Sequence, residues 1–208
     1  MFFVIHTVSQ FVFFVIARRH EVPTKQSVFE GRNRVIDLKK HIRDIPNFPK
    51  EGIIFKDITT LLRDRSAFAA AVDRIADEYK DKKIDVVLSV EARGFIFGAA
   101  VAYKMGLGMV PVRKKGKLPA KTHSVTYKLE YGQDALEIHQ DAFPKGARVL
   151  IVDDLLATGG TVSAVAGLVE KMGGKIAGIA FVIELLPLKG REKLKGYPVT
   201  SLIKDEYC

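Results

Sequence analysis

Arg148-Val-Leu-Ile-Val-Asp-Asp-Leu-Leu-Ala-Thr-Gly-Gly-Thr161 is the stretch that decides the fold of this 208-residue chain. Its apolar run, Val149 to Val152, is typical of a strand buried on both faces of a parallel sheet. Asp153 and Asp154 come next, where we expect the strand to emerge at its carboxyl end, the edge at which open α/β sheets bind ligands. The spacing of apolar residues from Val162 to Met172 then predicts a helix.

The segment between this strand and helix has the composition of a phosphate-binding loop. After Ala157, Gly159 and Gly160 allow a tight turn that exposes backbone N–H groups, while Thr158 and Thr161 add hydroxyl donors. The helix N-terminus contributes positive partial charge. Two carboxylates beside such a loop suit a phosphorylated sugar, because they accept hydrogen bonds from its hydroxyls. On composition alone, a glycine turn and a capped helix with solvated aspartates is the alternative.

The run Val152-Asp-Asp-Leu-Leu-Ala-Thr-Gly-Gly-Thr161 resembles the phosphoribosyl pyrophosphate signature of the type I phosphoribosyltransferases, in the form found in members that act on adenine. The resemblance implies that Asp153, Asp154 and residues 157–161 bind the phosphoribosyl group. It also implies a reaction in which adenine and 5-phosphoribosyl 1-pyrophosphate give AMP and pyrophosphate, carried out by a homodimer. Magnesium would be held mainly by substrate oxygens and water, so we expect no dedicated protein metal site.

A second glycine-containing turn follows another buried strand run, Ile84 to Val90. Its sequence, Glu91-Ala-Arg-Gly-Phe-Ile-Phe-Gly98, resembles the family's pyrophosphate loop and leads into a helix that we expect from Phe95 to Met105. The resemblance makes Arg93 part of the catalytic site, where its planar fork can bond phosphate oxygens. On composition alone, Arg93 could instead form an exposed ion pair with Glu91.

Four cations lie within five residues after a third expected strand, Met109 to Val112. The run Arg113-Lys-Lys-Gly-Lys117 could be a solvated face or a nucleic-acid patch, but the mutual repulsion of its charges favours an opposing polyanion. The resemblance assigns Arg113, Lys114 and Lys117 to the pyrophosphate. The residues that follow, up to Ser124, are typical of a loop that closes over a site.

Pro49-Lys-Glu-Gly-Ile-Ile-Phe-Lys-Asp57 resembles the family segment that holds the purine. The resemblance implies that Ile54, Phe55 and Lys56 bind adenine, together with Leu185 near the end of a later strand. Phe55 would stack on the base, a contact that contributes on the order of 1–3 kcal/mol. Lys56 replaces the more usual arginine and lacks its bidentate fork. Without the resemblance, Phe55 is an ordinary core residue.

Alternating apolar and polar residues between Val125 and Ile138 predict a β-hairpin with its turn at Gly132-Gln-Asp134. The segment Tyr127-Lys-Leu-Glu-Tyr-Gly132 resembles the family's flap over the nucleotide site. The resemblance makes Glu130 the catalytic acid or base at the purine. Composition alone makes Glu130 an exposed strand residue.

Residues 1–34 precede the region of resemblance, so we expect a transferase domain at 35–208 and an N-terminal extension with no catalytic role. The apolar run at residues 1–17 is short for a spanning helix and lacks the charge pattern of a signal peptide, although a membrane or targeting role is the alternative. At the start of the domain, the helical spacing from Val35 to Ile45 predicts a helix.

The chain carries a net charge of +9 and a single cysteine, Cys208. This excess of basic residues is typical of a protein that binds nucleic acid or a polyanionic small substrate. Because we recognise no nucleic-acid-binding motif in the sequence, we favour the substrate. A lone cysteine cannot form an internal disulfide, which indicates either a reducing compartment or a chain indifferent to the redox state of its compartment. We expect a cytoplasmic protein without a membrane partner.

Strand and helix patterns alternate from Ile84 to Ile183, so we predict an α/β fold with an open, mostly parallel sheet flanked by helices. The N-terminal segments would add a small hood, and the hairpin a flap. Two other functions stay open. Another purine phosphoribosyltransferase, acting on hypoxanthine, guanine or xanthine, would be separated by a base-competition assay. A non-catalytic regulator that senses phosphoribosyl pyrophosphate would usually add a DNA-binding domain, and we recognise none in the sequence.

Overall fold

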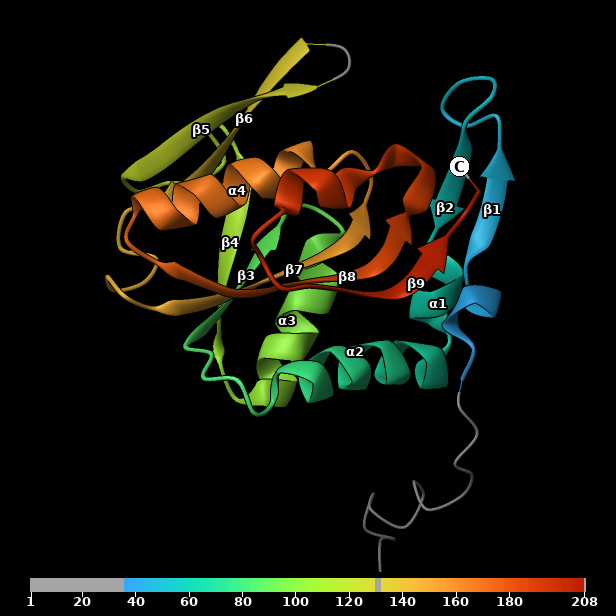
Figure 1. Ribbon diagram of the computed structural model, residues 1–208, viewed down its shortest axis with the longest axis horizontal. Helices are drawn as coiled ribbons and strands as arrows, with labels where there is room; N and C mark the ends of the chain where they lie inside the picture. The colour runs from blue at the N-terminus through green and yellow to red at the C-terminus, as the bar shows by residue number, and fades with distance from the viewer. Residues whose placement is uncertain (1–35, 130–131, 208) are drawn as a thin grey trace, which may run out of the picture. The chain divides into compact units, whose positions relative to one another are not determined.

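The computed structural model describes residues 36–129 and 132–207, so the predicted N-terminal extension lies outside the described residues. Seven strands form one sheet in the order β5-β6-β4-β3-β7-β8-β9 (Figure 1). Pairing is parallel from β4 through β3, β7 and β8 to β9, and antiparallel from β4 to β6 and β5. The five parallel strands are β3 (Val86–Val90), β4 (Gly108–Lys114), β7 (Arg148–Leu156), β8 (Lys175–Leu185) and β9 (Val199–Asp205). The predicted open, mostly parallel sheet is confirmed.

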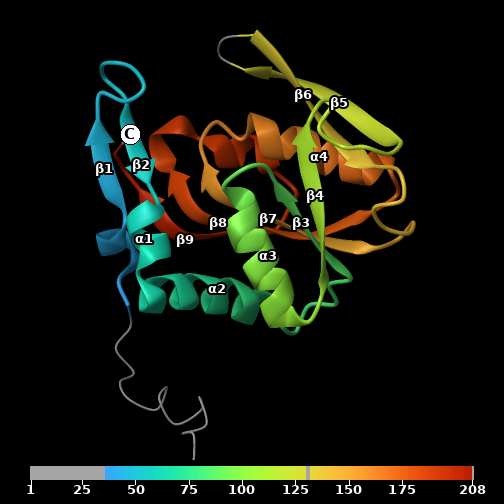
Figure 2. The same cartoon turned by 180° about the vertical axis from the view of Figure 1, so that it is seen from behind.

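Helices cover both faces of this sheet, with α2 (Arg65–Tyr79) and α3 (Gly94–Met105) on one side and α4 (Gly160–Lys171) on the other (Figures 1 and 2). Alternate residues of β7 therefore enter different cores. Leu150 packs in the core that includes α2 and α3, whereas Ile151 packs in the core that includes α4. A strand covered on both faces needs apolar residues at every position, which is the pattern from Val149 to Val152.

Strand β7 is longer than the sequence predicts. It continues to Leu156 because its pairing with β8 extends as far as the partners Leu156 and Glu184. Asp153 and Asp154 therefore belong to the last part of the strand, at its carboxyl end as expected. The glycine turn that comes after Leu156 still lies at the carboxyl edge of the sheet. Strand β3 ends beside it, because β3 and β7 are parallel neighbours.

The helix predicted from Val35 to Ile45 is wrong. The described part of this segment holds one turn of 3-10 helix, η2 (Leu38–His41), and then strand β1 (Arg43–Pro46). Strand β1 pairs antiparallel with β2 (Ile54–Asp57) to form a two-stranded hood, and α1 (Thr59–Arg63) follows. Local apolar spacing favours a helix here, but pairing with a strand about ten residues later prevails.

The predicted hairpin is present as β5 (Thr122–Leu129) and β6 (Gly132–His139). Gly132, Gln133 and Asp134 belong to β6 and pair with β5, so the turn predicted at these three residues is wrong. Strand β5 begins before Ser124, which shortens the predicted loop. Strand β6 pairs with the end of β4 and so joins the hairpin to the main sheet. Glu130 lies outside the described residues.

Strand β8 leads into two 3-10 helices, η3 (Leu186–Leu188) and η4 (Gly190–Leu194), before β9.

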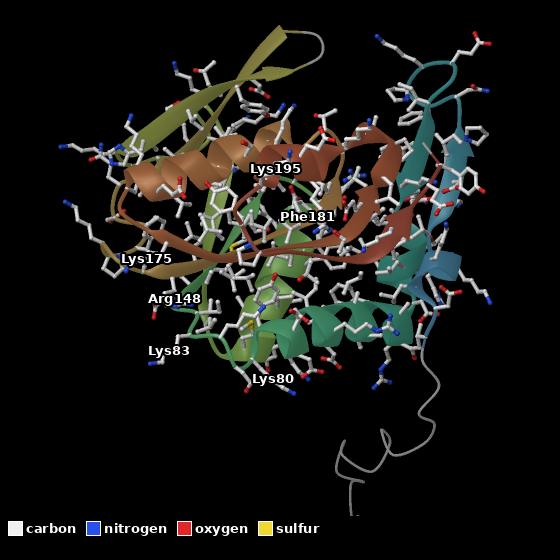
Figure 3. All side chains as sticks on the ribbon, in the orientation of Figure 1. Lys80, Lys83, Arg148, Lys175, Phe181 and Lys195 are labelled. Carbon is white, nitrogen blue, oxygen red and sulfur yellow. The ribbon has the colours of Figure 1, made fainter. Side chains whose placement is uncertain are left out.

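Several of the basic residues lie far from the glycine turn. Arg148 and Lys175 begin β7 and β8, so they lie at the edge opposite the glycine turn, with Lys80 and Lys83 on the same side (Figure 3). A polyanionic substrate therefore accounts for only part of the excess of basic residues. Among the described residues, no helix is long and apolar enough to cross a membrane.

Candidate active site

A cavity of about 400 Å³ opens at the carboxyl ends of β3 and β7. The two glycine-containing segments predicted to bind phosphates meet there, because their strands are parallel neighbours. The cavity is lined by residues 90–93 and 153–162 together with Lys114, Tyr127 and Leu136. Arg93, Lys114, both aspartates and the whole loop from Ala157 to Thr161 are thus brought together as predicted. Tyr127 and Leu136, from the hairpin, were not predicted as site residues.

The loop from Ala157 to Thr161 ends β7 and begins α4. Gly159 has a φ of 74°, a left-handed conformation that a residue with a side chain rarely adopts. It is also the N-cap residue of α4 and has no side chain to cap the helix. The N–H groups of the first helical turn therefore remain available to a ligand, and the helix dipole favours an anion at this end.

The two aspartates at the end of β7 face different neighbours. Asp153 Oδ1 accepts a hydrogen bond from the backbone N of Asp154 at 2.9 Å. It also packs against Gly94 at the start of α3, so closely that a Cβ at Gly94 would lie less than 3.0 Å from this oxygen. Burial and the neighbouring charge of Asp154 raise the pKa of Asp153. The conformation of this carboxylate is therefore fixed by α3.

Arg93 links the second glycine-containing turn to the aspartates. Its Nε lies 2.8 Å from Asp154 Oδ2, so the alternative of an exposed pair between Arg93 and Glu91 is wrong. Burial raises the pKa of Asp154, and the positive charge of Arg93 opposes that rise. Asp154 Oδ2 is buried and makes no hydrogen bond of regular geometry, so this contact is an ion pair only. The Arg93 guanidinium also lies 5.2 Å from the centre of the Phe55 ring.

The three residues of the basic run that were predicted to bind pyrophosphate differ in their contacts and in whether they line the cavity. Nε and Nη2 of Arg113 each lie 3.0 Å from Glu91 Oε2 and donate to it, which holds this guanidinium beside the Glu91–Ala92 peptide bond, a cis bond. Lys114 lines the cavity and pairs with Asp134 of β6 at 3.2 Å. Lys117 is exposed and does not line the cavity. Glu91 and Asp134 were missed, although a run of four cations signals that counter-charges lie near it.

The predicted base-binding residues do not line the cavity. Phe55, in β2, makes an edge-to-face contact with Phe48 at 5.2 Å between ring centres. The ammonium of Lys56 is buried between Asp205 at 2.8 Å and Asp44 at 3.0 Å. Burial alone would lower the pKa of Lys56, but the two aspartates outweigh it and raise the pKa. A contact from Lys56 to a base would therefore come from its backbone.

Leu185, at the end of β8, is buried at 7% exposure and packs in the core that includes α2 and α3.

Within residues 36–129 and 132–207, no group of three or more His, Cys, Asp and Glu side chains could hold a metal ion. Three carboxylates line the cavity: Glu91, which is paired with Arg113, and the two aspartates. Asp153 and Asp154 carry hard carboxylate oxygens of the kind that magnesium prefers, and Asp154 Oδ2 is already paired with Arg93 at 2.8 Å.

Comparison with known proteins connects this cavity with a family. The model of the phosphoribosyl transferase domain matches residues 59–206. Adenine phosphoribosyltransferase of Clostridium kluyveri is 63% identical over 169 residues, covering 81% of this chain and 98% of the relative. The enzyme of that name from Clostridium perfringens is 63% identical over 168 residues, with the same coverage.

Solved structures agree with the sequence relatives. Adenine phosphoribosyltransferase from Thermoanaerobacter pseudethanolicus matches with a TM-score of 0.78 and 56% identity, covering 81% of this chain and 98% of that one. The Saccharomyces cerevisiae enzyme, complexed with adenine and an imino-altritol bisphosphate, matches with a TM-score of 0.75 and 43% identity over 79% of this chain and 96% of that one. This chain therefore belongs to the phosphoribosyl transferase family, among its adenine phosphoribosyltransferases.

Proposed function

We propose that this chain converts adenine and 5-phosphoribosyl 1-pyrophosphate to AMP and pyrophosphate, as a magnesium-dependent homodimer of purine salvage in the cytoplasm. One observation carries the proposal. A single cavity brings together an anion-binding helix N-terminus, the half-buried carboxylate of Asp153, the buried carboxylate of Asp154 and the cations Arg93 and Lys114. A phosphorylated sugar with a diphosphate leaving group needs each of these features in one place.

The loop from Ala157 to Thr161 holds the 5′-phosphate in this proposal. The free N–H groups at the start of α4 supply donors, and the hydroxyls of Thr158 and Thr161 supply more. Asp153 and Asp154 accept hydrogen bonds from the ribose hydroxyls. As the bond from the anomeric carbon to the diphosphate breaks, positive charge develops on the ribose, and a nearby carboxylate stabilises it.

The diphosphate leaves toward the cations of the cavity. Arg93 and Lys114 line the cavity and bind the phosphate oxygens, and Arg113 and Lys117, from the same run as Lys114, add positive charge. Lys114 is paired with Asp134 on the hairpin, so an arriving diphosphate competes with this carboxylate for the ammonium group. Arg93 acts at both ends of the reaction, because the side chain that faces the diphosphate also pairs with Asp154 and lies beside the ring of Phe55.

The purine binds against the hood. Phe55 stacks on the base, backbone groups of Ile54 and Lys56 read its edge, and Leu185 closes the far side. As the new bond forms from the anomeric carbon to the purine nitrogen, that nitrogen's proton must leave. Glu130, which the resemblance places on the flap, accepts it.

Magnesium fits the donors of the cavity. Asp153 and Asp154 would offer hard oxygen ligands, directly or through water, and the diphosphate would provide the rest. When bound, the metal neutralises part of the diphosphate charge. Asp153 and Asp154 also keep the sugar hydroxyls oriented, a task that needs no metal.

The homodimer is supported by an exposed apolar face on α3. Ile96 and Tyr103, which are 42% and 89% exposed, are seven residues apart and so share one side of the helix. Tyr103→Glu should shift the sedimentation coefficient from dimer to monomer if this face mediates association. The cytoplasmic location rests on the lone cysteine alone.

The proposed reaction is tested by assaying nucleotide formation from adenine, hypoxanthine, guanine and xanthine, each with 5-phosphoribosyl 1-pyrophosphate and magnesium. We expect AMP from adenine and a kcat/KM for the other bases lower by a factor of at least about 100, which corresponds to roughly 2.7 kcal/mol. Preference for another base would assign a different purine transferase. Binding of 5-phosphoribosyl 1-pyrophosphate without turnover of any base would favour a sensor.

A further inference from the structure

Helix η4 lies directly against the phosphate loop, although about 30 residues separate the two in sequence. A Cβ on Gly190 would lie less than 3.0 Å from the carbonyl oxygen of Ala157 and 2.9 Å from the backbone N of Gly159. A Cβ on Gly159 would in turn lie less than 3.0 Å from the carbonyl oxygen of Gly190. Two main chains are therefore in contact, with no room for a side chain on either.

An ion pair fixes η4 in this place. Nε of Arg191 donates to Glu184 Oε1 at 2.9 Å, and Nη1 donates to the carbonyl oxygen of Val199 at 2.9 Å. Glu184 is 4% exposed and belongs to the end of β8, the strand that pairs with β7 beneath the loop. The hydrogen bond from Arg191 lowers the pKa of Glu184, so the pair is charged at neutral pH. At the other end of η4, Leu194 is buried in the core that includes α4.

We propose that Gly190, held in place by the Arg191–Glu184 pair, is a positioning residue that sets the shape of the phosphate loop and hence its affinity for a 5′-phosphate. This inference rests on the proposed function, in which that loop holds the phosphate of AMP. Donors at a helix N-terminus bind a phosphate well only when several N–H groups converge on it. Gly190 packs against Ala157 and Gly159 and does not itself line the cavity, so its backbone limits how far the loop can relax away from the cavity.

A residue that only contributed to packing would affect every ligand alike. The contribution of the loop is isolated by comparing AMP with adenosine, which differ only in the 5′-phosphate. Isothermal titration calorimetry of both ligands gives the ratio of their dissociation constants for the wild type, for Gly190→Ala and for Arg191→Lys. Gly167→Ala is the matched control, because Gly167 is exposed on α4 and a Cβ there would meet nothing within 4 Å.

We expect Gly190→Ala to weaken AMP binding at least tenfold and to leave adenosine binding within twofold. Arg191→Lys, which keeps the charge but loses the bidentate fork, should show the same selective loss to a smaller extent. Gly167→Ala should match the wild type for both ligands. If Gly190→Ala does not fold, Arg191→Lys alone decides the question, since its side chain is 41% exposed and the change is conservative.

Two results would overturn the inference. One is AMP binding within twofold of the wild type in folded Gly190→Ala, or in Arg191→Lys where that variant alone folds. The other is an equal loss for AMP and adenosine, which would show general destabilisation of the site. A wild type that binds AMP no more tightly than adenosine would overturn the proposed function itself, and this inference with it.

Discussion

Arg93 Nε lies 2.8 Å from Asp154 Oδ2, so a single ion pair joins the turn after β3 to the end of β7. Asp154 is 5% exposed, whereas the Arg93 side chain is 37% exposed and reaches the cavity. The buried partner is therefore the more sensitive one, because a charge left without its partner in a buried position is costly. In the proposed reaction, this pair connects the group that binds the diphosphate with the group that stabilises the ribose.

The Arg93–Asp154 pair should act as a unit in catalysis. We expect Arg93→Gln and Asp154→Asn each to lower kcat by about 10- to 100-fold, or roughly 1.4 to 2.7 kcal/mol. The double variant should lose less than the product of the two single losses, since either change already breaks the pair. Steady-state kinetics of the four proteins measures this interaction. Strictly multiplicative losses would show that the two residues work independently.

The exposed pair of Lys104 with Asp73, at 2.9 Å, is the control for this cycle. Both side chains are about half exposed and lie on α3 and α2, away from the cavity. Exposed pairs contribute little to stability, so Asp73→Asn should leave kcat and KM unchanged.

Glu130→Gln should fold normally, bind 5-phosphoribosyl 1-pyrophosphate normally and lose kcat by about 10²- to 10⁴-fold, because glutamine keeps the size but cannot accept the purine proton. Single-turnover AMP formation measures the loss. Glu78→Gln, an equivalent change at an exposed position of α2, should have no effect. Equal turnover in the two variants would assign Glu130 to the ordinary surface of the hairpin.

Removal of residues 1–30 should leave kcat/KM within about twofold, a change of roughly 0.4 kcal/mol. The family match begins at residue 59, and every residue of the cavity lies at position 90 or beyond. The same assay on the full chain and the truncated chain, with circular dichroism as the check on folding, measures the difference. A larger loss, or a change in how the chain partitions into membranes, would give this segment a role.

The hood should lose stability in acid through Asp57. The backbone N–H of Thr59 and the guanidinium of Arg43 donate to this carboxylate and lower its pKa from 3.8 to about 2. A lowered pKa means that the stabilisation is complete above about pH 4 and disappears as the pH falls toward 2. The melting temperature of Asp57→Asn should therefore be lower than that of the wild type at pH 7. The difference between the two melting temperatures should begin to shrink below about pH 4.

Thermal melts of both proteins between pH 7 and pH 3 test this expectation. Asp81→Asn, at an exposed position beyond α2, is the control and should follow the wild type throughout. A melting gap at Asp57 that stays constant down to pH 3 would mean that its charge does not stabilise the hood.

Much of the cavity could be predicted because its parts are local in sequence. The run from Val149 to Val152 indicates a strand covered on both faces, and a glycine turn after such a strand lies at the carboxyl edge. The run from Ile84 to Val90 predicts a second strand of the same kind. Parallel strands carry their following turns to one edge, which brings Arg93 to the aspartates.

Contacts between distant segments could not be predicted. Nothing near Lys56 in sequence indicates that Asp205 will hold its ammonium at 2.8 Å, and nothing near Gly190 indicates that it touches Ala157. The wrong helix at the start of the domain has the same cause. Its apolar spacing is compatible with a helix, but β2 supplies a strand partner that local spacing does not reveal.

The structure of this protein crystallised with AMP tests the central claim most directly. We predict the 5′-phosphate on the loop from Ala157 to Thr161, the ribose hydroxyls at Asp153 and Asp154, and the purine against Phe55. A phosphate bound elsewhere, with the loop unoccupied, would contradict the account of this cavity as the phosphoribosyl site.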